Sequence, residues 1–91
     1  MYYIYILTNK TNSVLYTGIT NNLIRLIEEH KQKIDTNSFT ARYNVVKLVY
    51  YETTSDASVA IAREKQIKSG SRKKKLQLMS EMNPEWVDLS E

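Results

Sequence analysis

The chain has 91 residues, of which 42% are hydrophobic and 25% are charged, and its formal net charge is +3. This length fits one small domain with one core, and the composition argues against collagen-like, low-complexity and wholly disordered chains. The sequence has no cysteine, which excludes disulfide scaffolds, thiolate metal sites and cysteine nucleophiles and is typical of a cytoplasmic protein. We expect one domain over residues 1–91 with no membrane span and no signal peptide, because its apolar runs are only a few residues long.

A β-hairpin is predicted at the start of the chain. Tyr2–Thr8 and Val14–Ile19 are dense in β-forming residues, and the segment between them is polar and rich in turn formers. Side chains alternate along a strand, so Tyr3 and Tyr5 share one face, and pairing of the two strands brings Tyr16 near them. Cross-strand aromatic packing explains these tyrosines as well as a functional role does.

The next predicted elements are an amphipathic helix over roughly Asn22–Lys33 and a third strand over Val45–Glu52. Asn21 or Asn22 can cap this helix, and the polar segment from Asp35 to Ser38 ends it. Its apolar side includes one histidine, which is either a hydrogen-bonded core residue or a functional one. The residues of that side are Leu23, Leu26, Ile27, His30 and Ile34.

Two more helices are predicted before an acidic tail. The first begins at Ser55 or Asp56 and ends at Gly70, which we expect to form a left-handed cap. Ser71 caps the second, which ends before Asn83-Pro84, and Trp86 is the one large anchor in the tail of residues 80–91. The expected fold is therefore α/β (α+β), a three-stranded antiparallel sheet flanked by helices in the order β-β-α-β-α-α.

Glu64 is the most informative residue of the helix that precedes Gly70. The spacing of Ala57, Ala60, Ile61 and Ile67 puts this carboxylate inside an apolar stripe. A carboxylate in that position costs several kcal/mol unless it is paired, protonated or bound to a cation. Two interpretations stay open, an ion pair with Lys68 four residues on and a cation-binding role.

The charge is unevenly distributed. Residues 63–75 contain seven cations and one anion, whereas residues 80–91 contain four acids and no base. A basic block of this kind either contacts phosphate or forms a solvated helix face. The candidate nucleic-acid contacts are Lys65, Lys68, Arg72, Lys73, Lys74 and Lys75.

Taken in order, the motifs of the chain resemble those of the GIY-YIG nuclease superfamily, and in particular its small stand-alone bacterial members. The matching segments span nearly the whole chain. They are Tyr3-Ile4-Tyr5, Tyr16-Thr17-Gly18, Thr20 to Leu23, His30-Lys31, Phe39 to Tyr43, Leu48 to Glu52, Ala60 to Lys68 and Asn83 to Trp86.

The resemblance implies metal-dependent hydrolysis of DNA phosphodiester bonds and gives roles to matching positions. Tyr5 and Tyr16 are the tyrosines of the two motifs, and Tyr16 takes or relays the proton of the attacking water. His30 stands near the scissile phosphate, and Glu64 holds one divalent ion. With one histidine and no cysteine in the chain, that ion is expected to be Mg²⁺ or Mn²⁺. No organic cofactor is expected, and the oligomeric state is left open.

The sequence departs from the family pattern on the first helix. The family's catalytic arginine corresponds to Leu26, and Arg25 next to it lies about 100° around a helix, where Glu29 can pair with it. The candidate phosphate-binding residues are therefore Arg25, Arg42 and Arg63. Thr17 replaces the isoleucine of the second motif, on the strand face opposite Tyr16.

Three functions follow from these features. The leading hypothesis is an endonuclease with weak or undetectable cleavage, since loss of a transition-state donor typically lowers rates by ~10²–10³. The alternative is a nuclease-fold DNA-binding module with little or no cleavage. The third is an interaction module in which the motif residues are kept for packing.

Overall fold

The computed structural model describes residues 1–32 and 38–90, which form three strands and four helices. The strands are β1 (Tyr2–Thr8), β2 (Leu15–Thr20) and β3 (Lys47–Thr54). The helices are α1 (Leu23–Gln32), α2 (Phe39–Arg42), α3 (Ala57–Ser69) and α4 (Arg72–Met82), and the tail after α4 contains only turns.

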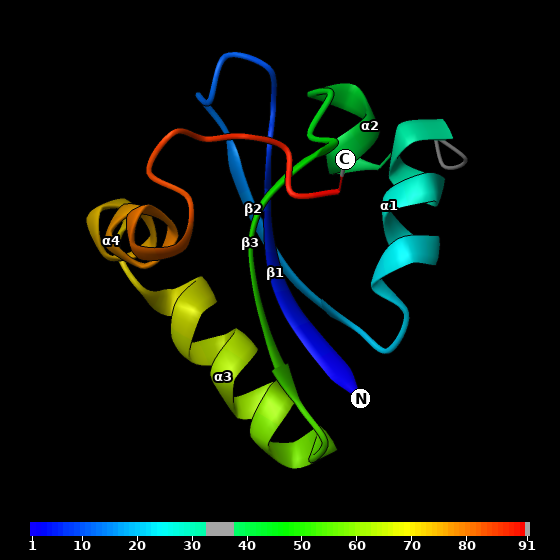
Figure 1. Ribbon diagram of the computed structural model, residues 1–91, viewed down its shortest axis with the longest axis vertical. Coiled ribbons are helices and arrows are strands. Elements are labelled where there is room, and N and C mark those ends of the chain that lie inside the picture. Colours follow the sequence, from blue (N-terminus) through cyan, green and yellow to red (C-terminus); the bar gives the residue numbers. More distant parts are fainter. Residues whose placement is uncertain (33–37, 91) are drawn as a thin grey trace.

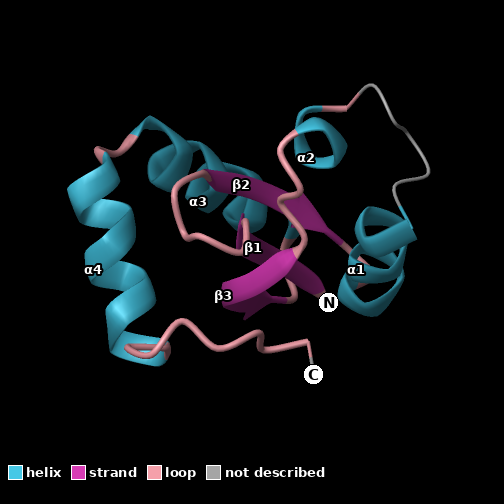
Figure 2. Ribbon diagram, turned by 90° about the horizontal axis from the view of Figure 1, so that it is seen from above, coloured by secondary structure: helices cyan, strands magenta, loops and turns pink. Residues whose placement is uncertain are grey.

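The three strands form one antiparallel sheet in the order β2-β1-β3, as predicted. Helices α1 and α2 lie on one side of this sheet, and α3 and α4 lie on the other (Figure 1). In the view from above, β2 and β3 are the two edge strands (Figure 2). None of the described helices is both long and apolar enough to cross a membrane.

The alternation of side chains along β1 divides the core into two layers. Ile4 and Ile6 pack with the α3 and α4 side, against Ala60, Ile67 and Met79. Tyr5 and Leu7 instead pack toward α1 with Ile27, Val45 and Leu48. The apolar positions along β1 therefore serve both faces, which is why this central strand is buried from Ile4 to Thr8.

The N-terminal caps predicted for α3 and α4 are confirmed. The Asp56 carboxylate accepts hydrogen bonds from the backbone of Ser58 and Val59 at the start of α3, and Ser71 accepts from Lys74 at the start of α4. Gly70 ends α3, but the expected left-handed cap is wrong. Its φ is −71° and its ψ is 160°, because the chain passes in extended form directly into the cap of α4.

Three other boundaries differ from expectation. The second strand is shifted by one residue, to Leu15–Thr20, and the third begins at Lys47 because Asn44 has a positive φ and Val45 donates to the Thr40 carbonyl. The one-turn helix α2 was not predicted, although its Ser38 cap follows the usual rule. The expected helix end at Lys33, Ile34 of its apolar stripe and the break at residues 35–37 lie outside the described residues.

The tail covers the free edge of β3. The buried Asn83 side chain donates to the Val49 and Val87 carbonyls, at 3.2 and 2.6 Å. Further on, the Leu89 amide donates to the Leu48 carbonyl at 2.8 Å. Trp86 is half-buried against the α3 and α4 layer, so the tail has more than the single anchor that the sequence indicated.

Candidate active site at the edge of strand β2

Two tyrosines meet where β1 and β2 pair. The rings of Tyr5 and Tyr16 lie 6.5 Å apart between centroids and are tilted by 39°. In the strand register Tyr5 is opposite Gly18 and Leu7 is opposite Tyr16, so the two rings are diagonal neighbours on the α1 side. The Tyr5 hydroxyl lies over Gly18, in the space that a Cβ would occupy there.

The surroundings of Tyr5 fix its protonation state. Its side chain is buried, and this burial raises the pKa of the phenol far above its usual value, with smaller effects in the same direction from Tyr16 and Glu64. Tyr5 therefore stays protonated at neutral pH and can donate a hydrogen bond, but it cannot serve as a base. Tyr16 is only partly buried and is the more accessible phenol of the pair.

Helix α2 connects His30 to this tyrosine pair. The Phe39 ring stacks on Tyr16 with centroids 6.1 Å apart, and the next residue, Thr40, hydrogen-bonds His30 through Nδ1 at 2.8 Å. Partial burial lowers the pKa of His30, so its imidazole is neutral at pH 7. The Thr40 bond occupies Nδ1 and leaves Nε2 as the nitrogen that can exchange a proton with a substrate.

Glu64 lies on α3, on the other side of the sheet from the tyrosine pair. Helix α3 packs on the face opposite to Tyr16, but it contacts β2. The Glu64 carboxylate adds to the raised pKa of Tyr5, the phenol that covers Gly18 on β2.

Among the residues that the structure describes, the Glu64 side chain has no hydrogen bond and no ion pair. The ion pair with Lys68, which the sequence left open, is therefore not formed. The predicted stripe around Glu64 is partly wrong, because Ala57 is exposed and Ile61 is 49% exposed, whereas Ala60 and Ile67 are buried. Glu64 lies beside the buried residues of α3 and is itself half-exposed, so ions from solvent can reach its carboxylate.

The residues at this edge fit a magnesium-type ion better than zinc. No group of three or more histidine or acidic side chains that could hold a metal ion occurs in the described part of the chain, so a cation at Glu64 would have one protein carboxylate as its ligand. Mg²⁺ and Mn²⁺ keep several water ligands and accept substrate phosphate oxygens, so one carboxylate is a sufficient anchor. A zinc site would need three or four protein ligands.

The three candidate phosphate-binding arginines are in different situations. Arg25 is exposed and pairs with Glu29 at 2.8 Å, as the sequence suggested. Arg63 pairs with Glu52 on β3, away from the tyrosines. Arg42 is exposed at the end of α2, the helix that also carries Phe39 and Thr40, and its side chain has no hydrogen bond or ion pair within the described ranges. Of the three arginines, Arg42 is therefore the one whose guanidinium is not already paired.

Leu26 occupies the position where a donor from α1 would be needed. Its side chain packs against the layer that contains Tyr5 and Ile27, so it presents hydrocarbon to the site. It also borders a recess of about 110 Å³ that is lined by Asn21, Arg25 and Glu29 among others. A longer side chain at position 26 would therefore find space in this recess and the Glu29 carboxylate beside it.

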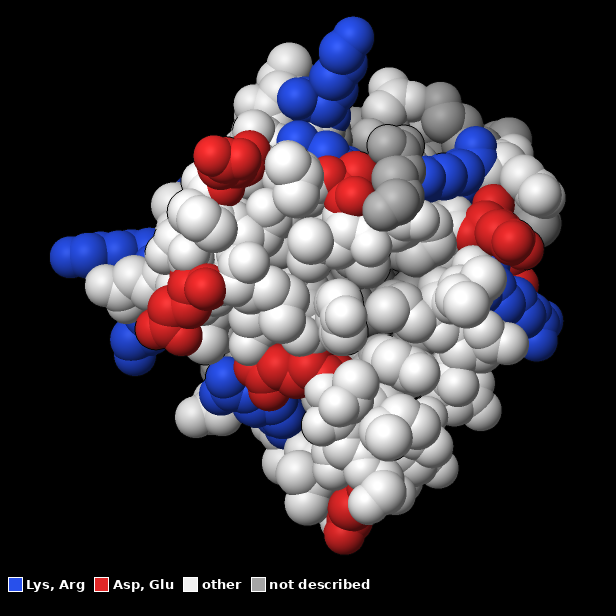
Figure 3. Space-filling model, viewed as in Figure 1, with Lys and Arg blue, Asp and Glu red and all other residues white. Residues whose placement is uncertain are grey.

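The predicted nucleic-acid contacts lie on α3 and α4. Five of the six are exposed, Lys75 is half-buried, and Arg72 donates to the carbonyls of Asn12 and Ser13 in the β1–β2 turn. On the face shown in Figure 3, acidic and basic side chains lie beside one another around an uncharged centre, so that face has no continuous basic surface. The basic segment is thus a local patch where α3 meets α4.

Sequence reasoning missed two components of the site region. Phe39 and Thr40 link His30 to Tyr16, and the only signal for them was the short match from Phe39 to Tyr43. The ion pair between Glu52 and Arg63 was also missed, because its partners come from different elements.

The chain is similar in sequence and fold to known proteins. Residues 1–77 match the GIY-YIG catalytic domain. The chain belongs to this family. The GIY-YIG chain is similar to a UPF0213 protein of Syntrophus aciditrophicus, with 40% identity over 83 residues that cover 91% of this chain and 93% of that one. It is 44% identical to a UPF0213 protein of Clostridium perfringens over 80 residues, 88% of this chain and 84% of the relative.

A solved structure supports the same fold for the GIY-YIG chain. The solution NMR structure of the UPF0213 protein BH0048 from Bacillus halodurans superimposes with a TM-score of 0.60 at 30% identity. The match covers 97% of this chain and 93% of that one. The predicted resemblance and the predicted three-stranded antiparallel fold are both confirmed.

Proposed function

We propose that this GIY-YIG domain is a metal-dependent nuclease that hydrolyses DNA phosphodiester bonds at the β2 edge, with a rate limited by Leu26. The observation that carries the proposal is the Tyr5–Tyr16 pair on strands β1 and β2, together with a Glu64 side chain that has no polar partner among the described residues, in a chain of this family. Hydrolysis requires that a water be deprotonated next to an anionic phosphate, and these residues supply the groups for it.

Each residue has a distinct part in the proposed reaction. Glu64 holds Mg²⁺ or Mn²⁺, which when bound neutralises phosphate charge and acidifies water. Tyr16 accepts or relays the proton of the attacking water, since Tyr5 is kept protonated by burial and acts as a hydrogen-bond donor. His30, neutral and held by Thr40, exchanges a proton near the phosphate.

A DNA-binding module with little cleavage is the second candidate, and the position of Leu26 favours it. In this chain α1 directs a hydrocarbon side chain to the site, and Arg25 and Arg63 are paired elsewhere. Of the three candidate phosphate-binding arginines, only Arg42 then has an unpaired side chain in the described part of the chain. Binding depends less on this donor than catalysis does.

Plasmid nicking together with DNA-binding anisotropy separates the two candidates. The nuclease proposal expects nicking with Mn²⁺ or Mg²⁺ that disappears in EDTA and in the Glu64→Gln variant, whereas that variant still binds DNA. Binding without any nicking at high protein concentration would favour the binding module. Nicking that is lost in Arg42→Gln, in a folded variant, would identify Arg42 as the phosphate donor.

A further inference from the structure

Helix α3 is in contact with both edge strands of the sheet. Its Arg63 reaches Glu52 on β3, and the helix also contacts β2. The charge of Glu64, the next residue, adds to the raised pKa of the Tyr5 phenol, which covers Gly18 on β2. The strand order β2-β1-β3 puts Glu52 and Gly18 on opposite sides of the central strand. Successive side chains on a helix are separated by about 100°, so fixing the direction of one fixes that of the other.

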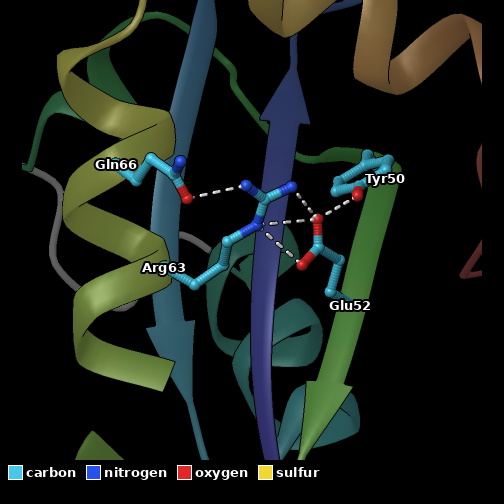
Figure 4. Close-up of polar contacts among 4 residues, drawn as sticks. All are labelled: Tyr50, Glu52, Arg63 and Gln66. Carbon is cyan, nitrogen blue, oxygen red and sulfur yellow. Dashed lines mark hydrogen bonds and ion pairs between the residues drawn. The ribbon is translucent and has the colours of Figure 1, made fainter. Parts of the chain in front are cut away.

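The contact of Arg63 with β3 is a fork-shaped ion pair. Its Nε donates to both Glu52 oxygens, at 2.9 and 3.2 Å, and its Nη2 donates to Oε2 at 2.8 Å (Figure 4). The Tyr50 hydroxyl donates to the same carboxylate, and Arg63 Nη1 donates to Gln66 one turn along α3. The pair is only about 30% exposed, so its geometry is held by several bonds at once.

The apolar packing of α3 fixes its rotation only weakly. Its buried residues are Ala60 and Ile67, and the first of these has almost no side chain. Val59 and Ile61, which flank Ala60, are 53% and 49% exposed. Because so few side chains of α3 are buried, apolar packing alone does not fix the rotation of the helix about its axis. A directional contact is needed to fix it.

We propose that the Glu52–Arg63 ion pair is a positioning device that sets the rotation of α3 and thereby directs Glu64 to the Tyr5–Tyr16 edge of the sheet. The inference rests on the proposed function, because Glu64 is taken as the metal ligand. Arg63 and Glu52 are engaged with each other on the β3 side, so the role assigned to them is that of positioning residues. Supporting groups of this kind typically contribute about 10–100-fold to metal affinity.

The test must separate position from charge. Removing Arg63 alone deletes a cation beside Glu64, which would by itself strengthen Mn²⁺ binding. The double variant Glu52→Gln/Arg63→Gln removes equal and opposite charges, so a change in Mn²⁺ affinity reports position. The matched control is Lys31→Gln/Asp88→Asn, which removes an ion pair between α1 and the tail.

The measurement is paramagnetic broadening of the Tyr5 and Tyr16 ring signals during titration with Mn²⁺ alone, with circular dichroism as the check of folding. We expect the Glu52→Gln/Arg63→Gln variant to bind Mn²⁺ about 10-fold more weakly than the native chain, whereas the control variant binds it equally well. Native affinity in the folded double variant would overturn the positioning role. If that variant does not fold, Arg63→Lys replaces it, since lysine keeps the charge but loses the fork. A several-fold loss in Arg63→Lys supports the inference, and unchanged affinity rejects it.

The Glu64→Gln variant makes the two failures distinguishable. Broadening that persists in Glu64→Gln would show that Glu64 holds no ion, which rejects the metal site of the proposed function. Broadening that is lost in Glu64→Gln but unchanged in the Glu52/Arg63 double variant rejects the positioning device alone.

Discussion

The Tyr5 hydroxyl fills the space above Gly18, so the first and second tyrosine-containing motifs are joined by a direct contact between their strands. Any side chain at residue 18 would have to displace the buried ring of Tyr5. The glycine is thus required by close approach, not by backbone conformation, since no glycine among the described residues has a positive φ.

The first prediction concerns this contact. Gly18→Ala should lower the free energy of unfolding by about 1–3 kcal/mol, because the added methyl overpacks a buried ring. Removing the hydroxyl in Gly18→Ala/Tyr5→Phe should recover part of that loss, and urea denaturation of the four proteins of the cycle measures the coupling. Additive effects of the two substitutions would contradict the contact.

Thr17 gives a prediction of opposite sign. Its side chain is buried on the α3 side, and its hydroxyl has no hydrogen-bond partner among the described residues. Thr17→Val keeps the shape and removes the unsatisfied oxygen, so it should stabilise the protein by about 1 kcal/mol. Thermal and urea unfolding measure this, with Thr8→Val as the control, because the Thr8 hydroxyl donates to the Val14 carbonyl at 2.7 Å. A less stable Thr17→Val protein would show that the hydroxyl is satisfied.

The polar network around Glu52 predicts an alkaline transition. Burial, together with the hydrogen bond to Glu52, raises the pKa of Tyr50 to about 12. The folded state thus retains a proton that the unfolded chain releases near pH 10, so stability is present below pH 10 and is lost as pH rises toward 12. An absorbance titration at alkaline pH counts the tyrosines that ionise only as the pH approaches 12. The Tyr50→Phe variant should have one such tyrosine fewer than the native protein. An unchanged titration curve would contradict the assignment.

DNA binding by the patch where α3 meets α4 predicts a salt dependence. Replacing Lys73, Lys74 and Lys75 with glutamine should weaken DNA binding and reduce the slope of log K against log salt by up to about 3, roughly one per lost phosphate contact. The same three positions changed to arginine keep the charge and serve as the control. Fluorescence anisotropy at several salt concentrations measures both; equal slopes in the native and glutamine proteins would assign these lysines to a solvated face.

Most of the fold could be predicted from local patterns. Alternating strands, the helix stripe that contains Leu23 and Ile27, and the capping residues Asp56 and Ser71 are encoded by neighbours in sequence. Helix α2 was missed because four residues are too few for a periodic signal, and Asn44 moved the start of β3 through a backbone conformation that composition does not reveal.

The candidate site was predictable only in part, for a different reason. The residue types of Tyr5, Tyr16, His30 and Glu64 came from ordered motifs, but their roles remain proposals. The long-range contacts that orient them, such as Thr40 with His30 and Glu52 with Arg63, join elements whose relative placement depends on the packed core. A pattern along one helix also overestimated the burial of Ile61, since that helix touches the sheet along a narrow line.

A metal-dependent nuclease site that lacks one donor should gain activity in Leu26→Arg, and plasmid nicking measures this gain. Leu26 borders a recess with an acidic neighbour, so a folded arginine variant is expected, with melting temperature checked first and Leu26→Gln as the uncharged control. We expect weak or undetectable nicking by the native chain, an increase of ~10–10³-fold in Leu26→Arg with Mg²⁺ or Mn²⁺, and loss of that gain when Glu64→Gln is added. A folded Leu26→Arg protein that nicks no better than the native chain, or a gain that survives Glu64→Gln, would contradict this expectation.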